Sequence, residues 1–115
     1  MTAHPVTAAQ AASLLRQLAQ ATDDPTRAYD YPAEAAATAE ALAEVADQLR
    51  AASKRLDRYV RAHRHSDDWR STDRETPRYW TDEAAVEAEN ATHHARQTQA
   101  RLNNTAQALR HLAPN

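Results

Sequence analysis

Three features of the 115-residue sequence predict an all-α fold. Apolar side chains recur at alternating steps of three and four along two long segments, the spacing of a helix that packs along another helix. Glycine, on which tight hairpin turns between strands depend, is absent. Alanine, the strongest helix former, fills 28 positions. We predict a single domain, residues 1–115, with a long antiparallel helical hairpin and a short N-terminal helix, assembling into a helical-bundle oligomer.

The first helix is predicted over residues 7–21. Thr7 belongs to the residue types favoured at N-caps, and one face carries the apolar residues Ala8, Ala11, Leu15 and Leu18. The helix is expected to stop before Pro25, because a proline disfavours helical backbone at the residue that precedes it.

The central helix is predicted over residues 32–62. Pro32 suits the first turn, where its missing N–H would have no partner in any case. The interior contains no glycine or proline. One stripe of this helix, named here the leucine stripe, consists of Leu42, Val45, Leu49, Ala52, Leu56 and Tyr59.

A loop over residues 63–80 is expected to precede a last helix over residues 81–112. Thr76-Pro77 and Thr81-Asp82-Glu83 are both chemically suitable starts for that helix, and the sequence does not choose between them. Its alternation is the most regular in the chain and comprises Ala84, Ala88, Ala91, Ala95, Thr98, Leu102, Thr105, Leu109 and Leu112.

The two long helices are expected to pair so that opposite positions have numbers summing to about 144. Large side chains then mostly meet small ones: Leu56 lies opposite Ala88, and Leu49 lies opposite Ala95. Such complementarity allows close packing without voids. It is a hypothesis about register that a structure can test.

The apolar core is expected to be thin, because burial stabilises a fold by about 25 cal/mol per Å² of apolar surface and alanine has little surface to bury. The first helix can cover only residues 32–47 and the chain after Gln97. The uncovered half predicts a non-enzymatic module for self-association or protein–protein interaction, with a homo-oligomer (a dimer) or a helical protein as partner. The predicted seam is Leu49, Ala52, Leu56, Tyr59, Ala88, Ala91 and Ala95.

The second half of the central helix is basic, which raises an alternative function. A nucleic-acid-associated accessory or regulatory protein would use this face, or an acidic partner would bind it, through Arg50, Lys54, Arg58, Arg61 and Arg64. In the loop region, Trp69, Tyr79 and Trp80 would add stacking contacts. The net charge of −2 makes any positive surface local.

No set of side chains predicts catalysis, so we expect neither an enzyme nor a cofactor. Cysteine is absent, and no serine lies in an activating context. His63, His65, Asp67 and Asp68 are similar in spacing to the His-x-His-x-Asp cluster of certain metallohydrolases, where the cluster follows a strand and further histidines complete the site. Here it ends a helix, where cationic side chains are favoured electrostatically, and we expect no metal.

The segment Trp69-Arg70-Ser71 lies between two alanine-rich helices and resembles the small secreted Trp-x-Gly helical hairpins. The resemblance covers the two long helices and implies a dimeric secretion partner. Ser71 stands where that family has glycine, the loop is longer, and a further N-terminal helix is present. The Tyr79-x-x-x-Glu83 spacing matches the letters of that family's tail signal but precedes the last helix. We therefore assign the chain to no family.

The N-terminal residues show neither a basic region nor a hydrophobic core of a secretory signal. No apolar run approaches the ~20 residues that cross a bilayer. We expect a cytoplasmic protein with no membrane partner.

Overall fold

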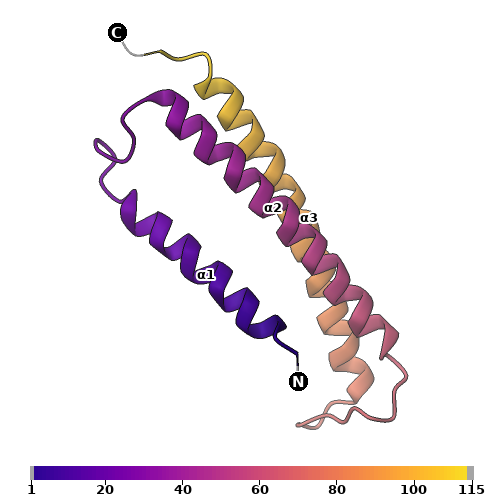
Figure 1. Ribbon diagram of the computed structural model, residues 1–115. Coiled ribbons are helices and arrows are strands. Elements are labelled where there is room, and N and C mark those ends of the chain that lie inside the picture. The colour runs from indigo at the N-terminus through magenta and orange to yellow at the C-terminus, as the bar shows by residue number, and fades with distance from the viewer. Residues whose placement is uncertain (1, 114–115) are drawn as a thin grey trace.

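The computed structural model describes residues 2–113 and contains three helices with no strand in that range. They are α1 (His4–Ala21), α2 (Pro32–Ala62) and α3 (Pro77–Leu109). Figure 1 shows α2 and α3 as a long antiparallel hairpin, with α1 running antiparallel to α2 and beside it past its midpoint. The molecule is a rod with extents of 65 × 23 × 23 Å. The predicted all-α hairpin is confirmed. None of the helices in residues 2–113 has the length and apolarity to cross a membrane.

The helix ends follow from local chemistry and correct three predicted boundaries. α1 begins at His4 rather than at residue 7, because Pro5 fits its first turn; the Thr7 hydroxyl donates to the Ala3 carbonyl oxygen instead of capping the helix. α3 begins at Pro77, the earlier of the two starts, since the Thr76 hydroxyl accepts a hydrogen bond from the Tyr79 N–H. It ends at Leu109, not at residue 112.

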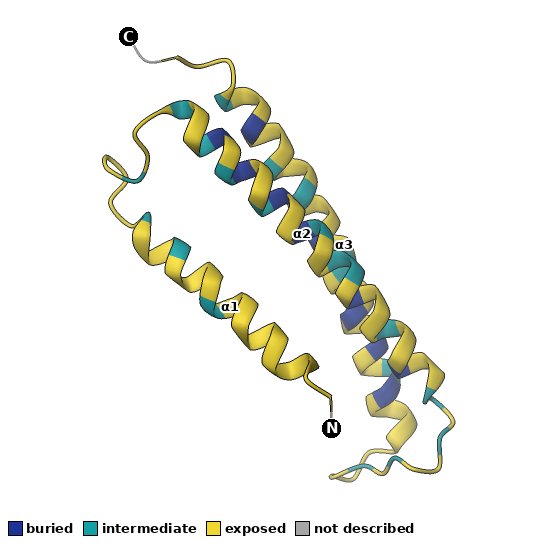
Figure 2. Cartoon of the chain, in the orientation of Figure 1, coloured by how far each residue is buried: buried dark blue, intermediate teal, exposed yellow. Residues whose placement is uncertain are grey.

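α2 and α3 meet along a row of small side chains, named here the alanine seam and visible as the dark blue positions of Figure 2. On α2 the buried residues are Ala36, Ala39, Ala43, Ala46, Ser53 and Val60, and on α3 they are Thr81, Ala85, Ala88, Ala95 and Ala106. Small residues let two helix axes approach closely, since little side-chain volume separates the backbones. Among residues 2–113, no large side chain is fully buried.

The leucine stripe does not form this seam, so the predicted pairing of the hairpin was wrong. Leu49, Leu56 and Tyr59 remain 57%, 58% and 54% exposed. The buried positions of α2 follow the same three-four alternation one residue further along, which is a rotation of about 100° around the helix. The leucine stripe was the predicted seam because its residues are the more apolar ones. The three-four spacing alone does not distinguish two adjacent stripes of the same helix.

The interhelix ion pairs give the register directly. Arg61 lies 3.4 Å from Glu89, Arg64 lies 2.9 Å from Asp82, and Arg110 lies 2.8 Å from Glu40. These position numbers sum to 150, 146 and 150, rather than to about 144. On α3 the prediction was correct only in part: of the nine predicted positions, Ala88 and Ala95 are buried and Leu102 and Leu109 are half-buried, whereas the others are exposed.

α1 stands apart from the hairpin. None of its residues, all of which the structure describes, is buried. Within residues 2–113, no Cα atom of α1 lies within 8 Å of a Cα atom of α2 or α3. Helices that pack against each other have axes 8–10 Å apart and bring Cα atoms closer than this. The first helix therefore lies beside α2 without closing a three-helix core.

The alanine seam makes a stability prediction. Replacing Ala95 by leucine places three extra carbon atoms where α2 and α3 touch, and overpacking of this kind costs about 1–3 kcal/mol. The same change at Ala91, which is exposed on the same helix, is expected to stay within about 0.5 kcal/mol of the parent. Urea unfolding followed by circular dichroism measures both. Equal effects at the two positions would contradict the observed seam.

Candidate functional site

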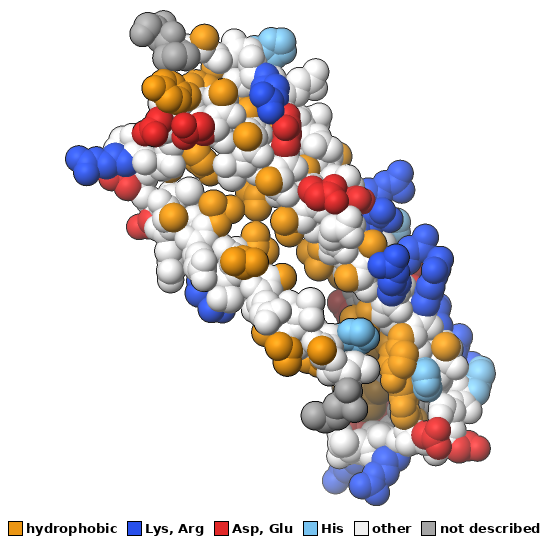
Figure 3. All heavy atoms as spheres, viewed as in Figure 1, with side chains coloured by type: hydrophobic (Ala, Val, Ile, Leu, Met, Phe, Trp, Pro, Cys, Tyr) orange, Lys and Arg blue, Asp and Glu red, His pale blue; other side chains and the backbone are white. Residues whose placement is uncertain are grey.

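A groove with a volume of about 640 Å³ lies between α1 and α2. We name it the α1/α2 groove. Its α1 wall consists of His4, Thr7, Ala8, Ala11, Ala12 and Leu15, and its α2 wall consists of Val45, Gln48, Leu49, Ala52 and Arg55. Figure 3 shows hydrophobic side chains of both helices bordering this hollow. Since no Cα atoms of the two fully described helices approach within 8 Å, the apolar faces border the groove from its two sides without close backbone packing.

The groove walls keep much of their apolar surface accessible. Leu15 is 39% exposed and Val45 is 41% exposed. No Asp or Glu lies among the lining residues, and only His4 and Arg55 can carry charge. The leucine stripe continues past the groove through Leu56 and Tyr59, which are also exposed. An elongated apolar ligand would therefore find a surface that runs along α2 for several helical turns.

The predicted seam residues are divided between two surfaces. Leu49 and Ala52 line the groove, and Leu56 and Tyr59 extend it. Ala88 and Ala95 are buried in the hairpin and are not accessible to a partner, whereas Ala91 is exposed.

Sequence reasoning missed the α1 wall of the groove. Ala8, Ala11 and Leu15 were assigned to one helix face, but that face was expected to cover α2. Their common apolar face was the available signal. The sequence pattern does not indicate how far α1 lies from α2, and this distance is what creates the groove.

An aromatic cluster closes the far end of α2. The His63 ring stacks on Trp69 with ring centroids 4.9 Å apart and an interplanar angle of 9°, and it lies 4.5 Å from the Tyr59 ring. Nδ1 of His63 donates to the Tyr59 carbonyl oxygen at 3.0 Å. A hollow of about 520 Å³ beside the cluster is lined in part by Val60, Trp69 and Trp80. The cluster fastens the start of the 63–76 loop to the end of α2.

Asp73 organises the second half of that loop. Its Oδ1 atom accepts hydrogen bonds from the Trp80 indole at 2.8 Å, the Ser71 hydroxyl at 2.7 Å and the Glu75 N–H at 2.9 Å. These bonds, that of Trp80 first, lower the pKa of the Asp73 carboxyl below its ordinary value. Trp69 and Trp80 thus hold the loop in place: the Trp69 ring stacks on His63, and the Trp80 indole N–H donates to Asp73.

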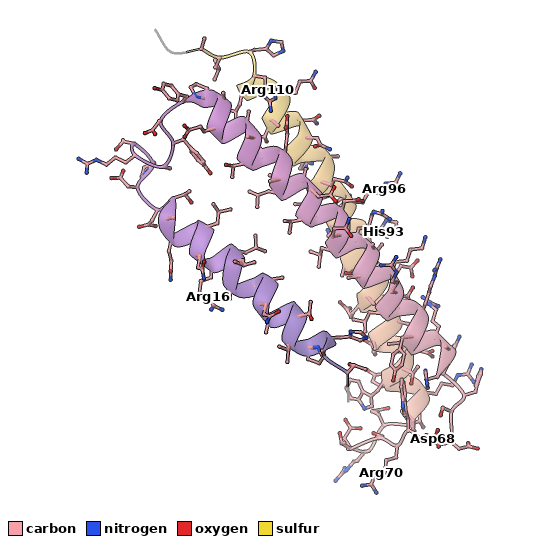
Figure 4. The ribbon with its side chains drawn as sticks, viewed as in Figure 1. Arg16, Asp68, Arg70, His93, Arg96 and Arg110 are labelled. Atoms are coloured by element: carbon pink, nitrogen blue, oxygen red, sulfur yellow. The ribbon has the colours of Figure 1, made fainter. Side chains whose placement is uncertain are left out.

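The histidine and aspartate cluster is not assembled as a metal site. Within residues 2–113, no group of three or more His, Asp or Glu side chains is placed to hold a metal ion. His63 stacks on Trp69 and contacts the tilted Tyr59 ring, while His65, Asp67 and Asp68 are in the loop, with Asp68 beside the 520 Å³ hollow. Figure 4 shows Asp68 and Arg70 at this end of the molecule.

Much of the basic face of α2 is paired with carboxylates. Arg50 contacts Asp47 at 2.9 Å, and Arg61 contacts Asp57 at 2.7 Å as well as Glu89. The hydrogen bond to Asp57 raises the pKa of Arg61. The Nε atom of Arg64 lies near Asp82, although its N–H is not aimed at the oxygen, so this contact is an ion pair rather than a hydrogen bond.

The remaining cations of this face, Lys54 and Arg58, form no ion pair within residues 2–113, and Lys54 shares a hollow with two acids. This smaller hollow between α2 and α3, about 250 Å³, gathers Arg50, Lys54, Asp57, Glu89, Thr92, His93 and Arg96. Figure 4 shows His93 and Arg96 on the side of the hairpin away from α1. Because acidic and basic side chains lie together in this hollow, we expect it to attract phosphate only weakly.

The Asp73 network predicts an acid transition of the loop. Because the pKa of Asp73 is lowered in the fold, its bonds are complete above the ordinary value of 3.8 and are lost as the pH falls through the lowered pKa. The indole N–H resonance of Trp80, followed by NMR during acid titration, is expected to move with a midpoint below 3.8. In the Asp73→Asn variant this step should disappear. A step of the same midpoint in that variant would assign the titration to another carboxyl.

Comparisons of this chain with protein-family models, with curated proteins and with solved structures find no match. The function therefore has to be argued from the surfaces that the fold creates. Of the three hollows described above, the α1/α2 groove has the largest volume and the most apolar walls.

Proposed function

We propose that this protein is a non-enzymatic helical module that binds an α-helix of a protein partner in the α1/α2 groove. The observation that carries the proposal is the separation of α1 from α2, with apolar side chains on both walls and no contact between the backbones. A monomer rarely leaves such a surface wet without an interaction to fill it.

The energetics favour an apolar occupant. Removing a leucine or valine side chain fully from water contributes about 1.5–3 kcal/mol. Leu15, Val45 and Leu49 are each only partly covered, so an occupant that completes their burial gains a fraction of that value at each. Because the hairpin seam is made of alanines, this surface holds apolar area that the core of the protein does not use.

The shape favours a helix as the occupant. The groove runs parallel to two helices, and its walls present apolar residues at helical spacing. Amphipathic helices bind such grooves through residues at positions i, i+3, i+4 and i+7. The alternative function, nucleic-acid binding by the basic half of α2, has less support, because Arg50, Arg61 and Arg64 are engaged with acids. Phosphate binding would weaken steeply with rising salt, whereas groove binding should not.

Site-specific photo-crosslinking tests the proposal. A photoreactive residue replaces Leu49 in the groove or, as the control, Lys54, which is exposed on the same helix but lines the hollow on the α2/α3 side. Both proteins are irradiated in extract from source cells, and the cross-linked peptides are sequenced. We expect the Leu49 position alone to cross-link, and the cross-linked peptide to be an amphipathic helical segment.

A second substitution tests whether the cross-linked product depends on the groove rather than on a random encounter. Leu15→Asp places a charge on the opposite wall of the groove, and the loss of about 1.4 kcal/mol or more of binding would reduce the product by about tenfold or more. Equal cross-linking from both positions, no cross-linking, or a product that Leu15→Asp leaves unchanged would overturn the proposed function.

A further inference from the structure

The apolar face of α1 is left unsatisfied by its own chain. α1 has no buried residue, although Ala8, Ala11 and Leu15 share one face. Most helices in proteins gain their stability from packing an amphipathic face rather than from helix propensity, and α1 lacks such packing. The α1/α2 groove is equally unfilled. One molecule therefore carries an open apolar groove, and the apolar face of α1, which forms one wall of that groove, lacks a partner.

We infer that the occupant of the α1/α2 groove is α1 of a second copy of this chain, so that two copies exchange α1 helices reciprocally. The inference rests on the proposed function and names its partner. In a dimer with two-fold symmetry, each α1 lies in the groove of the other copy, and a contact made by residue i on residue j is repeated by j on i. In such a dimer each groove is filled and the apolar face of each α1 is covered, and no further copy is needed.

The buried area separates this occupant from a single docked helix. A helix of 18 residues is about 27 Å long and about 10 Å wide. Covering half its circumference buries about 400 Å² of the helix and a similar area of the walls. One docked helix thus buries about 800 Å², below the ~1,000 Å² that a specific interface needs. In the reciprocal exchange the contact between the two α1 helices is shared by both grooves, so the total is about 1,200 Å², which lies within the range of specific interfaces.

The charge distribution also selects α1 among the helices of the chain. α1 contains no Asp or Glu, and its only arginine is Arg16. Figure 4 shows Arg16 on the side of α1 that faces away from α2. α2 and α3 carry acids and bases along their lengths. A helix that enters an apolar groove loses solvation of every charge it carries with it, so the nearly neutral α1 enters at the lowest cost.

The mass in solution tests the inference first. The chain has a mass of 12.8 kDa, and sedimentation equilibrium at rising concentration is expected to give twice this value. Leu15→Asp and Leu49→Asp should each return the protein to the monomer. Val86→Asp, which makes the same kind of change at a residue exposed on α3, should leave the dimer intact. Far-ultraviolet circular dichroism confirms that each variant keeps its helices.

Disulfide mapping then identifies the helix that occupies the groove. The chain has no cysteine, so two singly substituted proteins can be mixed without background reaction. Leu49→Cys with Ala11→Cys is expected to give a disulfide between differently tagged chains, because α1 of one copy lies against α2 of the other. Lys54→Cys with Ala11→Cys is the matched control and should give none.

The outcomes separate this inference from the proposed function. A strict monomer at high micromolar concentration, or a dimer that neither aspartate variant disrupts, overturns the exchange of α1. If Leu49 still cross-links to a helix of a different protein, the proposed function stands without it. A dimer in which Leu49→Cys and Ala11→Cys fail to join also overturns the exchange.

Discussion

The close approach of α2 and α3 along the alanine seam is the constraint on which the rest of this structure depends. Alanines at Ala36, Ala39, Ala43 and Ala46 allow the two backbones to lie close together. A seam of this kind has little volume for leucine. Apart from Val60, the larger apolar residues of α2 therefore lie mainly on another face, and Val45 and Leu49 of that face line the groove beside α1.

The placement of alanines in the seam and of larger apolar residues on another face of α2 explains why the molecule is an extended rod with an open groove. The seam supplies a register and a straight hairpin, but it buries little apolar surface for each residue, and burial is the main favourable contribution to folding. The leucine stripe holds much of the surface that a larger core would have buried. With α1 held off α2, that surface is available to another helix, and the function proposed for the protein uses it.

The charged and aromatic residues act mainly on the hairpin itself. The Glu40–Arg110 pair joins one end of the hairpin, where the hydrogen bond between the two lowers the pKa of Glu40 and raises that of Arg110. At the other end, the stacked His63 and Trp69 rings and the Asp73 network hold the connecting loop. Arg50, Arg61 and Arg64 of the basic face, and His63 of the histidine and aspartate cluster, thus have structural contacts that account for their positions.

The sequence by itself determined that the chain is helical, where α2 begins and ends, and that its two long helices would pair, because these features follow from local propensity, proline positions and periodicity. It did not determine which stripe of α2 faces α3. Two stripes of equal period differ by one residue, and the choice depends on how closely two backbones can approach, which is a property of the pair. The groove is likewise a tertiary feature: α1 has an apolar face in the sequence, but only its distance from α2 in space turns that face into the wall of a site.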